Sequence, residues 1–140
     1  MQLPRSIGQE SYVRTAENHG GLRAALTGVV LVHLAVVFWH WSTLEHVRVP
    51  LSALQTAFVT LVLLVLPGVG VELLWTRRTR KAAAWVLLVS MFASLVFSFV
   101  TRFMLSSPDH VVTAQARSHA FVLSAAALVV TETVGTFLAA

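Results

Sequence analysis

The chain has 140 residues, of which 56% are hydrophobic and only 11% are charged, whereas a soluble domain carries about 25% charged residues. This composition excludes an ordinary water-soluble domain and indicates a membrane protein. The absence of cysteine excludes disulfides and thiolate metal sites, and the net charge of +4 comes from residues at the ends of apolar runs, which argues against a nucleic-acid partner.

Residues 1–21 are polar and contain Pro4 and several glycines. They predict a loose cytoplasmic tail with a short interfacial helix around residues 7–16. The first apolar run, residues 22–41, is too long for the hydrophobic part of a signal peptide and ends without a small-residue cleavage pattern. It therefore predicts a helix that is retained.

Four apolar runs have the length of about 20 residues that a helix needs to cross a hydrocarbon core of roughly 30 Å. They are residues 22–41, 52–75, 82–105 and 116–138. Because the connections between them are short, consecutive helices are expected to be antiparallel neighbours. The sequence thus predicts an all-α fold, a transmembrane up-down four-helix bundle that forms one domain over residues 22–140.

A basic turn, residues 76–81, connects the second and third runs and holds four of the ten Lys and Arg residues. Basic loops stay on the cytoplasmic side of a membrane. The turn's side carries seven basic residues when Arg5, Arg14 and Arg23 are added, against three on the other side, Arg48, Arg102 and Arg117. We therefore expect both termini to be cytoplasmic and the protein to lie in the cell membrane.

Small and hydroxylated residues mark the helix faces that should pack against protein. In the third run Ser90, Ser94 and Ser98 recur every four residues and lead to Arg102, so they share one face. The fourth and first runs carry similar stripes, namely Ala120, Ser124, Ala127, Thr131 and Gly135, and then Ala24 and Gly28. Such spacing lets helices approach closely.

Pro67 lies inside the second run with Gly68 and Gly70 beside it. A proline within a helix removes one hydrogen bond and frees the carbonyl four residues back, here that of Leu63. The sequence therefore predicts a kink near the middle of the membrane.

Two glutamates are candidates for an intramembrane proton or hydrogen-bond site. Glu72 lies near the inner interface at the level of Arg23, so an ion pair between the first two helices is its simplest explanation. Glu132 lies about 8 Å from its helix midpoint, at the depth of Pro67, where an ionised carboxylate is costly. It is predicted to be a proton carrier, a ligand, or a neutral hydrogen-bonded core residue that donates to the carbonyl freed by the proline.

Most histidines fall on the half opposite the basic turn. The ligand or metal candidates are His33, His40, Arg102, Asp109, His110 and His119. His33 and His40 are about 10 Å apart along their helix, so they cannot chelate one ion together. A set of His40, His110 and His119 with Asp109 or Glu45 has ligand types that suit a divalent metal or haem iron, although its spacing matches no known metal motif.

Motifs of common enzymes are absent from the sequence. There is no Gly-Lys-Ser/Thr phosphate loop, no Gly-x-Ser-x-Gly turn and no His-Glu-x-x-His helix. No cofactor is required by the sequence, and an enzyme is not the favoured class.

Three segments, residues 74–78, Ser90-Met91-Phe92-Ala93-Ser94-Leu95 and Ser106-Ser107-Pro108-Asp109-His110-Val111, resemble a family of small four-span bacterial integral membrane proteins of unassigned function. The resemblance covers about the middle third of the chain. It implies the four-span topology and no activity. Those proteins have a histidine before the phenylalanine where this chain has Arg102-Phe103, which counts against a shared haem or metal role.

Three functions remain open from the sequence. The leading one is a small multi-pass membrane protein that acts as an accessory, structural or ligand-binding module with a histidine-rich outer face, in contact with membrane lipid and able to join a homo-oligomer or larger complex. The second is a small proton-coupled transporter that works as an oligomer through Glu132 and the Pro67 kink. The third is a membrane enzyme acting on a lipid or quinone.

Overall fold

The computed structural model describes residues 7–47, 51–76, 78–104 and 118–140, and side chains within 20–45, 51–76, 78–104 and 118–140. Every element of these residues is a helix. Four helices are long and apolar enough to cross a membrane: Gly20–Glu45, Ala53–Trp75, Arg80–Met104 and His119–Ala139. All four overlap the predicted spans, so the all-helical four-span fold is confirmed.

The first span belongs to a much longer helix, α1, which runs from Ile7 to Val47. The helix passes through Gly20 and Gly21 without interruption, whereas the sequence predicted a loose tail up to that point. Two helical glycines cost only about 1 kcal/mol each. Extending a helix that is already nucleated costs much less than starting one, so the span can propagate backwards through them.

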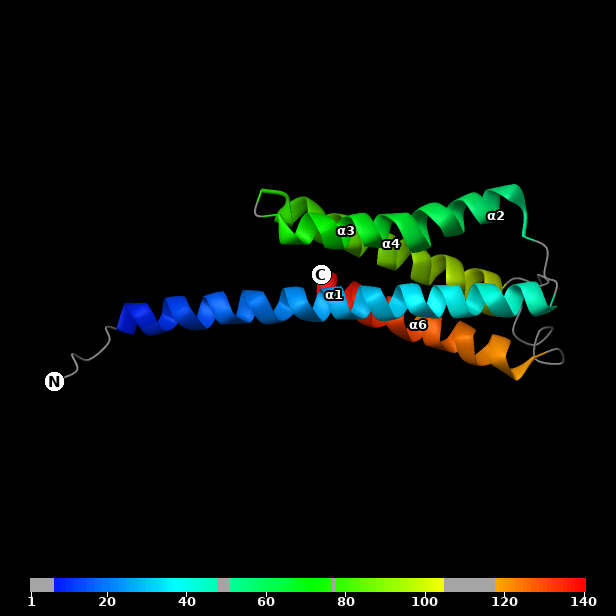
Figure 1. Ribbon diagram of the computed structural model, residues 1–140, viewed down its shortest axis with the longest axis horizontal. Coiled ribbons are helices and arrows are strands. Elements are labelled where there is room, and N and C mark those ends of the chain that lie inside the picture. Colours follow the sequence, from blue (N-terminus) through cyan, green and yellow to red (C-terminus); the bar gives the residue numbers. More distant parts are fainter. Residues whose placement is uncertain (1–6, 48–50, 77, 105–117) are drawn as a thin grey trace.

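The second span consists of three consecutive helical segments, α2 (Ala53–Phe58), η1 (Val59–Val65) and α3 (Leu66–Trp75). It begins with a capping box, in which Gln55 N donates to Ser52 Oγ at 3.2 Å and Ser52 N donates to Gln55 Oε1 at 2.9 Å. The segment η1 is a π-helix placed just before Pro67. The turns before the proline are thus wider than those of an α-helix and accommodate it without a break. The span bends gently between α3 and α2 (Figure 1).

The third span comprises α4 (Arg80–Phe99) and a second π-helix, η2 (Val100–Met104), which contains Thr101 and Arg102. The turn before α4 is closed by Thr79, whose Oγ1 donates to the Leu73 carbonyl at 2.8 Å. The fourth span, α6 (His119–Ala139), begins at Ser118, whose hydroxyl accepts from the Phe121 N–H at 3.4 Å.

Helix α6 packs against both α1 and α4, and α4 also packs against α3 (Figure 1). Two glycines permit the closest approaches. A methyl group added at Gly70 would lie 2.6 Å from Leu87 Cδ2, and one added at Gly135 would lie 2.8 Å from Met91 Cε. The predicted packing role of Gly135 is therefore confirmed, but Ala24 and Gly28 are exposed on α1, so the small-residue stripe of the first span does not pack inside the bundle.

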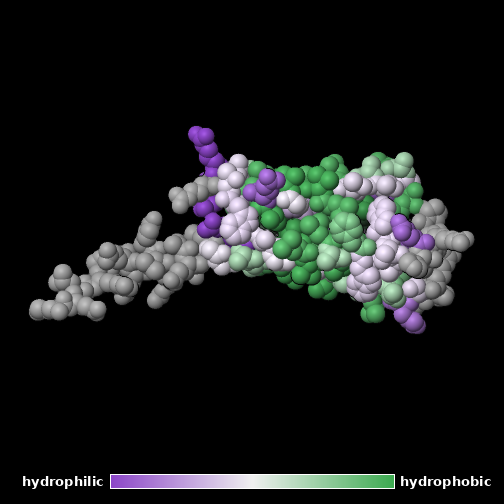
Figure 2. Space-filling model, viewed as in Figure 1, coloured by the Kyte–Doolittle hydropathy of each residue, from purple (hydrophilic) through white to green (hydrophobic). Residues whose placement is uncertain are grey.

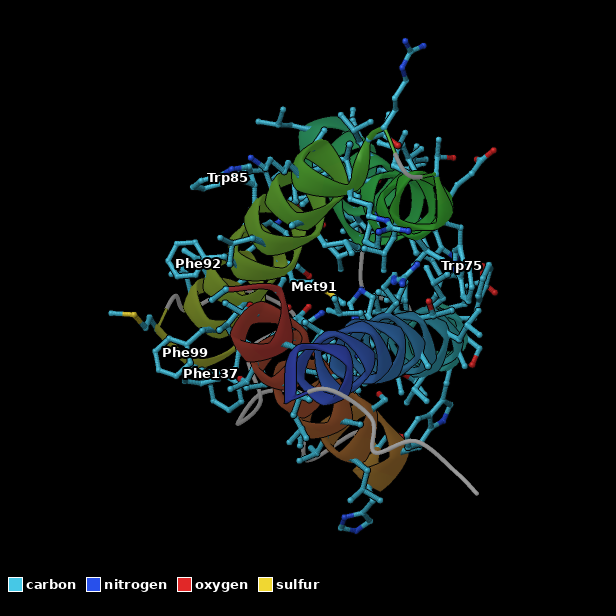
Figure 3. All side chains as sticks on the ribbon, turned by 90° about the vertical axis from the view of Figure 1, so that its left-hand side faces the viewer. Trp75, Trp85, Met91, Phe92, Phe99 and Phe137 are labelled. Atoms are coloured by element: carbon cyan, nitrogen blue, oxygen red, sulfur yellow. The ribbon has the colours of Figure 1, made fainter. Side chains whose placement is uncertain are left out.

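The outer surface matches a membrane setting. An apolar band lies across the molecule, with polar residues toward both of its ends (Figure 2). Looking along the bundle from the end of the basic turn, Met91 points between the helices, while the other labelled side chains point away from the bundle, namely Trp75, Trp85, Phe92, Phe99 and Phe137 (Figure 3). Large apolar side chains that face outward are expected where lipid is the solvent.

The interior differs along the length of the bundle. Toward the basic turn it is an apolar layer formed by Leu26, Val30, Leu74, Ala83, Leu87 and Met91, which we call the apolar seal. From the middle to the other end, buried polar groups line the space between α1, α4 and α6. These groups form the candidate site.

Candidate functional site: a buried polar network

Glu132 is the centre of the polar interior and has no exposed surface. Its Oε1 accepts hydrogen bonds from the hydroxyls of Ser94 and, at 2.9 Å, Ser98. Its Oε2 is buried and makes no hydrogen bond to any side chain or backbone group that the structure describes. A carboxyl group held in this way has one fixed oxygen and one oxygen available to a proton or a small ligand.

The serines are held in place by the helix that carries them. Ser90, Ser94 and Ser98 are fully buried on one face of α4, and Arg102 follows on the same face with only 4% of its surface exposed. The predicted protein-facing stripe is therefore confirmed. Arg102 lies at the end of this face and is buried inside the bundle. The π-helical turn η2 places it there, and π-turns are frequent at functional sites.

Arg102 connects two parts of the network by its position. It lines the same cavity as His40, and it lies one helical turn beyond Ser98, whose hydroxyl donates to Glu132. Arg102 therefore brings a positive charge into the polar half of the interior.

His33 is fully buried at the depth of the proline. Its Nε2 lies 3.2 Å from the Leu63 carbonyl, the one that Pro67 leaves without its helical donor. A carbonyl only accepts, so Nε2 carries a hydrogen. Nδ1 lies 3.4 Å from Thr131 Oγ1, whose own hydrogen is donated to the Leu128 carbonyl at 2.9 Å. The sequence predicted that this carbonyl would be freed and gave donation by Glu132 as one of three alternatives for that residue. The donor is His33.

His40 forms the end of the network farthest from the basic turn. Its Nδ1 lies 2.8 Å from Ser124 Oγ, and its ring packs at 4.9 Å from that of Phe121. Its Nε2 is buried and without a hydrogen bond to any described group. His40 and Arg102 line a cavity of about 20 Å³ whose other walls come from apolar residues such as Val37, Val59, Leu63 and Leu128. This volume suits about one water molecule.

Other predicted site residues do not join the network. Glu72 is exposed on α3 and His119 is exposed at the start of α6. Glu45 is also exposed and accepts a hydrogen bond from Trp41 Nε1 at 3.0 Å. Asp109 and His110 lie outside the described residues. Within the described side chains, no three His, Asp or Glu residues are placed to hold a metal ion.

Sequence reasoning missed the roles of Thr43 and Ser124. Thr43 Oγ1 donates to the His40 carbonyl at 2.7 Å and lies 3.4 Å from Ser124 Oγ. Ser124 and Thr131 had been recognised only as small residues on one stripe. Their separation of seven residues equals that of His40 and His33, and this matching spacing on two packed helices is the signal that would have paired them.

One further hollow lies on the outer surface, between the second and third spans. It has a volume of about 450 Å³ and is lined by Phe58, Phe92, Ala93, Val96, Phe97, Val100 and Thr101. Phe58 and Phe97 stack there with ring centroids 4.6 Å apart. Its lining is apolar apart from Thr101 and contains no titratable side chain.

Comparison with protein families, curated proteins and solved structures finds no match to this chain. The predicted resemblance to small four-span bacterial membrane proteins stays a prediction. The polar network is thus interpreted on its own geometry.

Proposed function

We propose that this protein is a small multi-pass membrane module whose buried network binds a proton at Glu132. The observation that carries the proposal is the carboxyl group itself, which is fully buried, fixed at Oε1 by two serine hydroxyls and without a described hydrogen bond at Oε2. Polar groups at membrane depth are expensive and mark functional sites by default.

The proposal includes a topology. The four spans form an up-down bundle with both termini and the basic turn in the cytoplasm. The distribution of Arg and Lys, which is denser on the side of the basic turn, supports this orientation. Membrane lipid surrounds the apolar band, and a lipid chain fills the hollow beside Phe58 and Phe97. In this arrangement the network extends from mid-membrane toward the outer surface.

The topology is tested with single cysteines, because the natural chain has none. Thr76 and Ala53 are exposed at opposite ends of the second span. In intact cells a membrane-impermeant maleimide should label Ala53→Cys and leave Thr76→Cys unlabelled until the membrane is broken. The reverse pattern would overturn the proposed orientation.

The function is tested by infrared spectroscopy of the protein in lipid nanodiscs as the pH is varied. We expect a carboxyl stretching band from a non-aqueous environment that titrates reversibly and is absent in Glu132→Gln. Glu72→Gln is the matched control, since Glu72 is exposed, and should leave that band unchanged. If Glu132 holds a single protonation state wherever the protein stays folded, it is not a proton-binding site.

A second function, proton-coupled transport by an oligomer, is favoured by one specific contact. The hydrogen bond from His33 to the Leu63 carbonyl joins the first span to the π-helical part of the second, next to Pro67. Because the Leu63 carbonyl is bound by the His33 side chain, a change at His33 can alter the conformation of this helix segment. Proton uptake by reconstituted vesicles that is driven by a second solute and lost in Glu132→Gln would establish transport. Uptake that does not depend on any solute would exclude the coupling.

A further inference from the structure

Glu132 has different surroundings on its two sides along the bundle axis. Toward the basic turn lies the apolar seal, whose members are all buried. Gly70 and Gly135 lie so close to Leu87 and Met91 that neither has room for a methyl group. The layer has no titratable member, and the buried hydroxyls beside it are those of Thr27 and Ser90. Ser90 donates to the Leu87 carbonyl of its own helix, and neither hydroxyl has a described hydrogen bond to Glu132, so the layer holds no continuous polar path.

On the other side the interior holds groups that can bind water. The cavity of about 20 Å³ is lined by His40 and Arg102, and the Nε2 of His40 is buried without a described partner. A buried water needs a polar site of about this volume with two or more partners. Leu44 and Leu51 also line the cavity and lie near the end of the bundle opposite the turn, so it is placed between Glu132 and that end.

We propose that a water molecule in this cavity is the entry point for protons, and that Glu132 exchanges protons only with the end of the bundle opposite the basic turn. The inference rests on the proposed proton-binding function and adds its direction. Solvent on that side supplies the proton to the cavity water. Glu132 is not in the cavity wall, but Leu128 and Arg102 are, one helical turn from Glu132 and from its partner Ser98. The proton crosses this turn and binds at Glu132 Oε2, so that the carboxylate becomes a carboxylic acid. It leaves by the same route, and Arg102 keeps its charge throughout because arginine does not deprotonate in proteins.

The neighbouring elements support this direction. The charged or titratable described groups near Glu132 are His33 and His40 on α1 and Arg102 on η2. The Nε2 of His33 donates to the Leu63 carbonyl, and its Nδ1 lies against Thr131 and does not line the cavity. His40 has its Nε2 available, which makes it the ring that can order and exchange protons with the cavity water.

The experiment uses the full chain in phosphatidylcholine vesicles, with the fraction of each orientation measured by maleimide labelling of the Thr76→Cys form. A pH jump is applied on the outside and the rate of change of the Glu132 infrared band is recorded. Molecules with the cavity end outward should respond at once, and molecules with the turn outward should respond only as the interior of the vesicle equilibrates.

Two variants test the cavity. His40→Phe should slow the response on the order of 100-fold, the size of effect typical of losing a positioned proton-transfer group. His119→Phe, at the exposed start of α6, is the control and should leave the rate unchanged. If His40→Phe does not fold, Val59→Ile adds one methylene to the cavity wall and should also slow the response.

The outcomes separate this inference from the proposed function. If the band fails to titrate in the wild-type protein, the proposed function is wrong. If it titrates but responds equally fast from both sides, or if His40→Phe and Val59→Ile both leave its rate unchanged, only the one-sided entry through the cavity is wrong.

Discussion

The two halves of the bundle interior are built from the same helices but differ in what fills them. The half near the basic turn is filled by the apolar seal, where Leu87 and Met91 meet the glycine backbones of α3 and α6. The half away from it contains hydrogen-bonded histidines, serines and a carboxyl group. Packing alone suffices to join helices in a membrane. The comparison shows that apolar packing joins the helices in one half, whereas buried hydrogen bonds between side chains are concentrated in the other, where we propose the function.

The largest expected effect comes from a cavity in the apolar seal. Leu87 is fully buried, and its truncation to alanine should lower the free energy of unfolding by about 2 to 5 kcal/mol. Val89→Ala, two residues away on the lipid-facing surface, should cost much less because lipid refills the space. Unfolding in mixed detergent micelles, followed by circular dichroism, measures both values. Equal losses would mean that the seal is not the packing centre.

The next effect concerns the closest helix approach. Gly70→Ala should destabilise the protein by about 1 to 3 kcal/mol, because the added methyl group meets Leu87. Gly68 has open space around it, so Gly68→Ala should be neutral or stabilising by up to about 1 kcal/mol. The same unfolding measurement compares the two. A stabilising Gly70→Ala would show that α3 and α4 can separate without loss.

A third prediction concerns the polar half and tests whether His33 compensates for Pro67. Replacing His33 by leucine should cost about 1 kcal/mol less in a Pro67→Ala background than in the natural chain, since a residue with an N–H can restore the helical partner of the Leu63 carbonyl. A double-mutant cycle of unfolding free energies measures this coupling. Additive losses would show that the contact of His33 with Leu63 is independent of the proline.

The smallest effect should come from the serine hydroxyls. Ser94→Ala and Ser98→Ala each remove a hydrogen bond to Glu132, worth on average about 0.6 kcal/mol in a membrane. Ser90 is the matched control, because its hydroxyl donates only to the Leu87 carbonyl of its own helix at 3.2 Å. If Ser90→Ala shifts the Glu132 infrared band as much as Ser94→Ala does, the band reports packing and not the hydrogen bonds.

The sequence predicted most of what depends on position along one helix. The span limits, the buried face of Ser90, Ser94 and Ser98, and the freed carbonyl of Leu63 all follow from helical periodicity and proline chemistry, and the structure confirms the spans and the face. The sequence did not predict contacts that depend on how each helix is rotated about its own axis relative to its neighbours. Whether His33 or Glu132 would reach the Leu63 carbonyl depends on which helices lie side by side, and no single-helix pattern contains that information.

The same limit explains the other differences. Ala24 and Gly28 have the residue types of a packing stripe, yet α1 turns that face outward because His33 and His40 occupy the opposite one. Arg102 was counted with the outer basic residues because it lies near the end of its span, and it was also placed on the face of the serines. It is buried within the π-helical turn η2.

The unbroken helix α1 has a mechanical consequence. At 1.5 Å per residue it is about 60 Å long, twice the thickness of the hydrocarbon core. The part before Gly20 extends the axis that carries His33 and His40 by about 20 Å. Because the helix has no break, a tilt of its axis at the polar network would displace its N-terminal end by a larger distance than the network itself moves.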